Sequence, residues 1–275
     1  MRHHTMCAAA LLSIHLLAAC HPRAPEPAPA PGTGITTRPV LALTTGEAGV
    51  AAMHDRYVGR WFHTLTFQQK TSRLLANGRW DVQTWYEAMK LPGRLRIDFA
   101  PLSAGNGVLY ARDSQFVIQR GRVVSATPGI NDLLLLGFDV YANLPARTIA
   151  LLRRQGFDLS HVHAAFFEDR PVIVVGARDG DLRSKQFWVD ADRLVFVRLL
   201  EPAPRDSSKV QDIRFRSYQR HGDAWIAPRV ELYTGSVLTF TEDYTDIRTD
   251  VPLDDELFEP GRWRTARHWV QETKN

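Results

Sequence analysis

The sequence contains one pair of residues spaced to bind a metal ion, His161 and His163. Alternate residues of a β-strand share a face, so both imidazoles could meet one zinc ion, with Glu168 and Asp169 nearby. A third ligand at a diagnostic spacing is missing. We therefore interpret the pair as the polar start of a strand, and the sequence predicts no metal site.

Other candidate reactive groups lead to the same conclusion. The acidic runs at 179–181 and 190–192 could bind calcium, but they fit solvated hairpin tips better, because Asp and Gly form turns and no EF-hand loop follows. The sequence has no Gly-x-Ser-x-Gly, P-loop, Gly-x-Gly-x-x-Gly or His-Glu-x-x-His motif. We expect no enzyme activity and no cofactor. A hydrolase built around His161 and His163 is the least favoured function.

Composition argues against two further classes of protein. Lys and Arg number 34 against 30 Asp and Glu, and this small excess is spread along the chain, so we expect no nucleic-acid partner. The two cysteines are Cys7 and Cys20. Since both lie near the N-terminus, the rest of the chain holds neither a disulfide scaffold nor a thiolate zinc site.

The N-terminal segment has the features of an export signal. Its apolar stretch, residues 8–19, is too short to span a bilayer as a helix and has the length of a signal-peptide core. The end of this stretch, Leu17-Ala18-Ala19-Cys20, resembles the lipobox of bacterial lipoproteins. The resemblance implies that residues 1–19 are a lipoprotein signal peptide and that Cys20 becomes the acylated first residue. The alternative is an ordinary signal peptide with an incidental cysteine.

Acyl chains on Cys20 would make the membrane a partner of the protein, since two or more chains give stable attachment. In lipoproteins of this kind an aspartate after the cysteine favours the inner membrane. His21 therefore implies the outer membrane of a Gram-negative bacterium, with the protein facing the periplasm. Residues 20–35 comprise the lipidated cysteine and a tether, because five of the fourteen residues 21–34 are proline. At about 3.1 Å per residue, this tether would span about 40 Å.

The remaining residues, 36–275, read as one domain that is mainly β with some α. Apolar spacing predicts helices at 46–59, 133–136 and 144–156, and period-two alternation predicts about ten or eleven strands. Asn77-Gly78 predicts a hairpin turn, and residues 94–99 alternate charged and apolar side chains as a half-buried strand does. Three helices are too few to cover so many strands as a flat layer. We therefore expect one large antiparallel sheet that curves around the helices.

The closing segment carries a family resemblance. Asp250, Val251-Pro252, Asp254-Asp255, Phe258 and Pro260 follow the final strand in the pattern that ends LolA/LolB-like proteins. The order of helix, strands, helical insert and strands is similar to that family as well. The resemblance implies an unclosed β-barrel, covered by a few helices, that carries acyl chains in periplasmic lipoprotein sorting.

The apolar positions of the strands are the candidate ligand-binding residues. We assign one set to a single inward phase and interpret it as the lining of an acyl-chain cavity, although alternation alone also fits a packed core. The set consists of Leu95, Ile97, Phe99, Leu109, Phe116, Ile118, Val172, Val174, Phe187, Val189, Ile213, Phe215, Leu238 and Phe240.

Two functions of different classes follow from these observations. The first is an outer-membrane-anchored periplasmic lipoprotein that binds or transfers acyl chains of lipoproteins or lipids in an apolar half-barrel cavity. The second is a sensor or scaffold module that binds a protein partner in the cell envelope. Co-purified lipid would favour the first function, and a cross-linked partner without lipid would favour the second.

Overall fold

A computed structural model describes residues 43–270. The expected signal peptide, Cys20 and the whole proline-rich tether lie outside these residues. The described body is built from β-strands around three helices, α1 (Gly46–Tyr57), α2 (Asp132–Gly137) and α3 (Pro145–Arg154). None of the helices in this part of the chain combines the length and the apolar character needed to cross a membrane.

Thirteen of the described strands form one antiparallel sheet, in the spatial order β6-β5-β4-β3-β2-β1-β15-β14-β11-β10-β9-β8-β7. A separate hairpin pairs β12 with β13. In chain order the strands are β1 (Thr64–Leu74), β2 (Trp80–Lys90), β3 (Arg94–Phe99), β4 (Asn106–Ala111), β5 (Ser114–Gln119), β6 (Arg122–Pro128), β7 (Val162–Phe167), β8 (Arg170–Val175), β9 (Gln186–Asp190), β10 (Phe196–Ala203), β11 (Asp206–Arg216), β12 (Gln219–His221), β13 (Ala224–Ile226), β14 (Arg229–Thr234) and β15 (Val237–Thr249).

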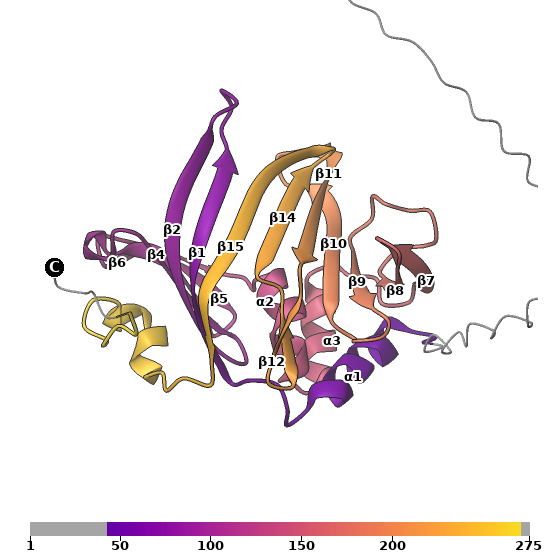
Figure 1. Ribbon diagram of the computed structural model, residues 1–275, viewed down its shortest axis with the longest axis horizontal. Coiled ribbons are helices and arrows are strands. Elements are labelled where there is room, and N and C mark those ends of the chain that lie inside the picture. The colour runs from indigo at the N-terminus through magenta and orange to yellow at the C-terminus, as the bar shows by residue number, and fades with distance from the viewer. Residues whose placement is uncertain (1–42, 271–275) are drawn as a thin grey trace, which may run out of the picture. The chain divides into compact units, whose positions relative to one another are not determined.

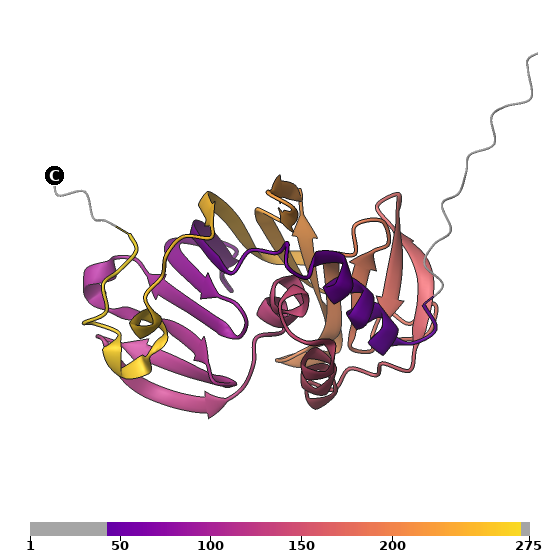
Figure 2. The same ribbon diagram turned by 90° about the horizontal axis from the view of Figure 1, so that it is seen from below.

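The sheet is curved and does not close into a barrel. Its two edges, β6 and β7, are consecutive strands along the chain, and α2 and α3 connect them across the sheet. In Figure 1 the sheet bends around these helices, and Figure 2 shows the helices lying across its open side. We call the face toward α1, α2 and α3 the inner face and the opposite face the outer face. The predicted unclosed antiparallel sheet is thus confirmed.

Local sequence signals account for the helices and the first hairpin. Thr45 caps α1 by accepting a hydrogen bond from the Ala48 N–H, at 3.2 Å. Asn131 caps α2 by accepting from the N–H groups of Leu133 and Leu134, and Pro145 occupies the first turn of α3. The predicted turn at Asn77-Gly78 joins β1 to β2, with Gly78 at a φ of 78°. The sequence patterns missed β6, whose residues are all exposed, and the short β12–β13 pair.

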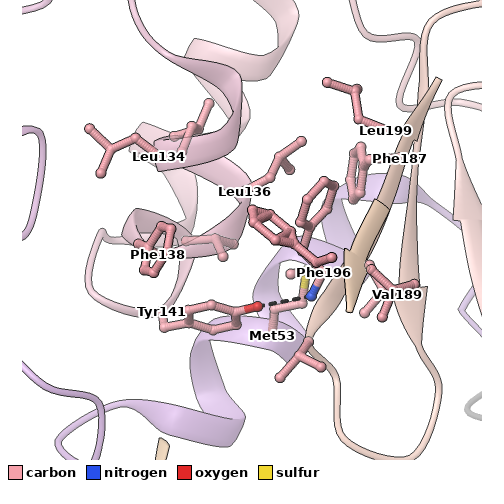
Figure 3. Packing of buried hydrophobic residues seen from close by; sticks show 14 of the residues in the cluster. Met53, Leu134, Leu136, Phe138, Tyr141, Phe187, Val189, Phe196 and Leu199 are labelled. Atoms are coloured by element: carbon pink, nitrogen blue, oxygen red, sulfur yellow. Dashed lines mark hydrogen bonds between the residues drawn. The ribbon is translucent and has the colours of Figure 1, made fainter. Parts of the chain in front are cut away.

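The main hydrophobic core lies between the inner face and the helices. Figure 3 shows helix and insert residues facing strand residues, with the N–H of Phe196 donating to the hydroxyl of Tyr141 at 3.0 Å. α1 approaches the sheet closely at Gly46, where a Cβ would lie 2.6 Å from Val175. This packing fixes the helices against the half of the sheet that contains β8–β11. The labelled residues are Met53, Leu134, Leu136, Phe138, Tyr141, Phe187, Val189, Phe196 and Leu199.

A second, smaller core covers part of the outer face. Residues 250–270, which we call the C-terminal strap, contain the short helices η3 (Asp255–Phe258) and η4 (Pro260–Arg262) and pack against β3, β4 and β6. Leu257, Phe258 and Trp263 of the strap bury Leu109 and Ile118 of the sheet. β3 is therefore covered on both faces, and its expected character as a half-buried strand is wrong, since Arg96 and Asp98 are buried as well.

Candidate ligand cavity on the inner face of the sheet

Strand register assigns three neighbouring strands to one inner surface. Residues directly opposite each other in adjacent strands point to the same face. Leu95, Ile97 and Phe99 of β3 are opposite Met89, Glu87 and Trp85 of β2, and Leu95 and Ile97 are opposite Tyr110 and Val108 of β4. This surface lies at the end of the sheet away from α1.

A cavity of about 230 Å³ remains between this surface and α2. Leu133, Leu134 and Phe138, in or next to α2, form one wall, together with Phe215 of β11. The opposite wall is made by β2, β3, β4 and β15. The strand residues and the α2 cap that complete the lining are Trp85, Glu87, Met89, Leu95, Ile97, Phe99, Val108, Tyr110, Asn131, Glu242 and Tyr244. The lining is therefore mainly apolar and aromatic, as is common in ligand cavities.

Two glutamates are the acidic groups of this cavity. Glu87 is only 5% exposed, and burial raises its pKa well above the usual range, with a further upward contribution from the charge of Glu242. Burial also raises the pKa of Glu242 to about 7, while the hydroxyl of Tyr244 donates a hydrogen bond to its Oε2 at 2.6 Å. Both carboxyl groups therefore favour the protonated state far more than exposed glutamates do.

Sequence reasoning missed both glutamates. Glu87 lies between Trp85 and Met89 in the period-two pattern, and Glu242 lies between Phe240 and Tyr244. Phe240 belongs to the predicted inward set, and alternation alone places Glu242 on the same side of the strand, two residues further along. A charged residue among the apolar residues on one side of a strand is the sequence signal that would have identified these two glutamates.

The structure places eight of the fourteen candidate ligand-binding residues on the inner face, Phe240 among them, but only four of the eight line the cavity. Leu95, Ile97, Phe99 and Phe215 do so. Phe187, Val189 and Ile213 are buried in the main core. Phe240 is opposite Leu232 and its ring lies 6.2 Å from that of Trp85, whereas Leu238 pairs with Tyr233 beyond a β-bulge.

Five of the candidate residues lie on the outer face, and their assignment to one inward phase is wrong. Leu109, Phe116 and Ile118 pack under the C-terminal strap. Val172 and Val174 are opposite Asp190 and Trp188, whereas Phe187 and Val189 are opposite Val175 and Ile173 on the inner face. Both faces of β4 and β8 are apolar, so the sequence pattern does not distinguish inside from outside there.

The histidine pair and the acidic runs form no metal site in the described chain. His161 Nε2 accepts a hydrogen bond from Arg178 at 3.0 Å. His163 Nε2 lies 3.8 Å from Asp179, while its Nδ1 is buried without a partner among the described residues. Asp181 accepts from the backbone and hydroxyl of Ser184, as expected of a turn residue. Within residues 43–270, no three His, Cys, Asp or Glu side chains gather as metal ligands do.

A larger groove of about 1610 Å³ lies on the outer side of the sheet. It runs between the C-terminal strap and strands β1, β2 and β15, and its lining includes Lys90, Arg248, Asp250, Arg267 and His268. Its walls are more charged than those of the inner cavity. The apolar inner cavity is therefore the better candidate for an acyl-chain site, despite its smaller volume.

Comparison with known proteins identifies the fold. No family model matches the sequence, and no curated protein matches it significantly. A DUF1329 family protein from Desulfovibrio piger superposes with a TM-score of 0.50 at 15% identity, covering 78% of this chain and 95% of that one. A putative outer membrane lipoprotein-sorting protein domain from Vibrio parahaemolyticus gives 0.51 at 10% identity, covering 79% and 99%. A LolA superfamily protein from Nitrosomonas europaea gives 0.48 at 12% identity, covering 76% and 96%.

The chain therefore has a LolA/LolB-like fold, a curved and unclosed antiparallel sheet with helices on its inner side. At these identities the likeness establishes the fold alone, and the function has to be argued from the residues of this chain.

Proposed function

We propose that the protein is an outer-membrane lipoprotein, anchored through acyl chains on Cys20, that binds an acyl chain of a lipoprotein or lipid on its inner face. The LolA-like fold and the Leu17–Cys20 motif support this proposal together. The fold is shared with a putative lipoprotein-sorting domain, and the motif accounts for attachment to a membrane. His21 after the cysteine favours the outer membrane and a periplasmic position.

The unfilled cavity beside α2 is the observation that carries the proposal. This cavity is partly open to solvent and is lined mainly by apolar and aromatic side chains, as sites for apolar ligands commonly are. An apolar cavity of about 150 Å³ can hold a six-carbon ring. By proportion, the volume of about 230 Å³ here accommodates a chain of about nine carbons.

Binding of this kind needs no covalent chemistry. At about 0.8 kcal/mol per buried CH₂, nine carbons would contribute roughly 7 kcal/mol before the cost of ordering the chain. Because the cavity is partly open, a longer acyl chain could extend out of it.

A sensor or scaffold function is the second candidate, and the edge strand β6 favours it. β6 pairs only with β5, and Val123 and Val124 on it are 42% and 54% exposed. An exposed edge strand can accept a strand from another protein. An envelope protein could therefore bind the half-barrel at β6 while the inner cavity remains empty.

Native mass spectrometry of the Cys20→Ser chain, purified from the periplasm without detergent, separates the two functions. Acyl-chain binding predicts a lipid-sized mass addition that disappears when Leu95→Trp fills the cavity. A mass without any addition, combined with cross-links from β6 to one envelope protein, would contradict the lipid proposal and support the scaffold.

A further inference from the structure

The inner cavity contains a carboxyl group, that of Glu87, for which the described part of the chain supplies no hydrogen-bond donor. Glu87 points into the cavity from β2 and is 5% exposed. Among the described residues, none donates a hydrogen bond to its carboxyl group, and only burial and the Glu242 charge shift its pKa. Buried polar groups are normally hydrogen-bonded, so an unpaired carboxyl group calls for an explanation.

The described groups next to Glu87 do not supply it with a donor. Gln69 on β1 is opposite both Trp85 and Tyr244, and its Oε1 is buried without a partner within the described chain. Its amide nitrogen donates to Thr71 at 2.8 Å, and a hydrogen bond from Gln69 also lowers the pKa of Glu242. Glu242 accepts a further hydrogen bond, from Tyr244. Glu87 is therefore the acid of this surface that lacks a donor among the described residues.

The described residues around the cavity offer no cation to fill this role. None of the side chains that line it is a Lys, Arg or His. On β3, Arg96 is committed to the outer face, where it pairs with Asp98. An anionic head group would meet only acids in this cavity, whereas a cation beside Glu87 and Glu242 would favour their ionised forms and pair with them.

We infer that the inner cavity binds an amphiphile with a protonated amine, which lies against Glu87 while its apolar chain packs on Leu95, Ile97 and Phe99. This inference rests on the proposed function, since it requires the cavity to hold an apolar chain. It adds the class of head group. A primary ammonium has three N–H donors and no acceptor, which matches a site whose unused atoms are acceptors.

Three eight-carbon probes with different head groups test the inference: octylamine, octanol and octanoate. Their binding to the Cys20→Ser chain is measured by isothermal titration calorimetry at about pH 8, where the amine is protonated. We expect octylamine to bind about tenfold more tightly than octanol, because a hydrogen bond to a charged group is stronger than one between neutral groups. Octanoate should bind most weakly of the three.

Glu87→Gln provides the decisive variant, and Glu259→Gln provides the control. Glu259 is an exposed glutamate on the C-terminal strap, paired with Arg112 on the outer face, so its loss tests general attraction of a cation to an acidic surface. The preference for octylamine should fall to within about twofold in Glu87→Gln and persist in Glu259→Gln. Circular dichroism shows that both variants are folded, and octanol binding should change much less than octylamine binding in Glu87→Gln.

Any other order of the three affinities contradicts the inference. The probes that still bind show whether the proposed acyl-chain function fails as well. Equal binding of octanol and octylamine, or tighter binding of octanoate, would mean that water, and not an amine, is the hydrogen-bond partner of Glu87. The inference would then fail, while the proposal that the cavity binds acyl chains would stand. A preference for octylamine that survives Glu87→Gln would place the cation elsewhere. If none of the three probes binds, both the inference and the cavity proposal fail.

Discussion

Arg96 and Asp98 form a two-point ion pair on the outer face of β3, with Nε to Oδ2 at 2.7 Å and Nη2 to Oδ1 at 3.0 Å. Their side chains are 2% and 5% exposed. The guanidinium group lies 3.8 Å from the ring of Trp263 and donates to the carbonyl groups of Leu257 and Trp263. One strand thus carries the cavity lining on its inner side and the attachment of the C-terminal strap on its outer side.

Arg96→Met is expected to lower the free energy of unfolding by about 3–5 kcal/mol, because it leaves Asp98 buried without its partner. Arg112→Met is the matched control: Arg112 pairs with Glu259 at an exposed site, where the loss should stay below about 1 kcal/mol. Urea denaturation monitored by circular dichroism measures both variants. Equal losses in the two variants would contradict a special role for the buried pair.

Gly107→Ala should detach the strap from the sheet. A Cβ on Gly107 would lie 2.1 Å from the carbonyl oxygen of Ile97 and 2.6 Å from the ring of Trp263, so we expect a cost of about 1–3 kcal/mol or more. Gly129→Ala is the control, because a Cβ there meets nothing within 4 Å. Hydrogen exchange should rise in residues 250–270 of Gly107→Ala only. An unchanged exchange pattern would show that the strap adjusts without detaching.

Leu95→Trp and Leu109→Trp enlarge side chains on opposite faces of the same sheet. Leu95 borders the cavity, so the larger side chain should fill open space and change stability by less than about 1 kcal/mol. Leu109 is fully buried in the outer core, where the same change should cost about 1–3 kcal/mol or more. Thermal unfolding provides the comparison. A severe loss in Leu95→Trp would mean that the inner face is close-packed.

The raised pKa values of Glu87 and Glu242 predict a pH-dependent gain from their removal. A carboxyl group with a raised pKa in the folded state makes its full contribution to stability below its unfolded pKa of about 4.5. This contribution is lost as the pH rises through the folded pKa, which is about 7 for Glu242. The stability of Glu242→Gln relative to the parent should therefore increase as the pH rises from about 5 to about 8. Urea unfolding at both pH values measures the difference.

Glu231→Gln should show the opposite sign. Hydrogen bonds from Arg229 and Arg216 outweigh burial and hold the pKa of Glu231 below its usual value, so its contribution is present at neutral pH and disappears as the pH falls below the unfolded pKa. The variant should be less stable than the parent at about pH 8 and approach it in acid. If Glu242→Gln and Glu231→Gln responded to pH alike, the assignment of Glu242 to a buried, unfavourable site would fail.

Cys20→Ser is expected to move the protein from the membrane fraction to the soluble periplasm, since the acyl chains that Cys20 is proposed to carry are its anchor. Cys7→Ser is the control and should leave the protein in the membrane, because residues 1–19 are removed in the proposed processing. Fractionation followed by a salt wash measures both variants. Retention of Cys20→Ser after the wash would refute lipid anchoring.

The fold class and many of the elements follow from local sequence signals. Apolar spacing located the helices, Asn77-Gly78 located the first hairpin, and the pattern from Asp250 to Pro260 indicated the LolA-like end of the chain. These signals are local, since each depends on hydrogen bonds or backbone angles within a few residues. The motif at Cys20 is local too, and the anchoring that it predicts awaits the fractionation experiment.

The side of each strand that faces the helices depends on long-range packing and could not be predicted from the sequence. Period-two alternation defines two faces, but β4 and β8 are apolar on both, so the pattern could not separate Leu109 from Val108. The outer face of β3 is buried because a strap 161 residues further along the chain returns to Arg96. Likewise, the curvature of the sheet brings Glu87 and Glu242 into one cavity although β1 lies between their strands. Contacts between residues so far apart in the chain cannot be predicted from the local sequence pattern.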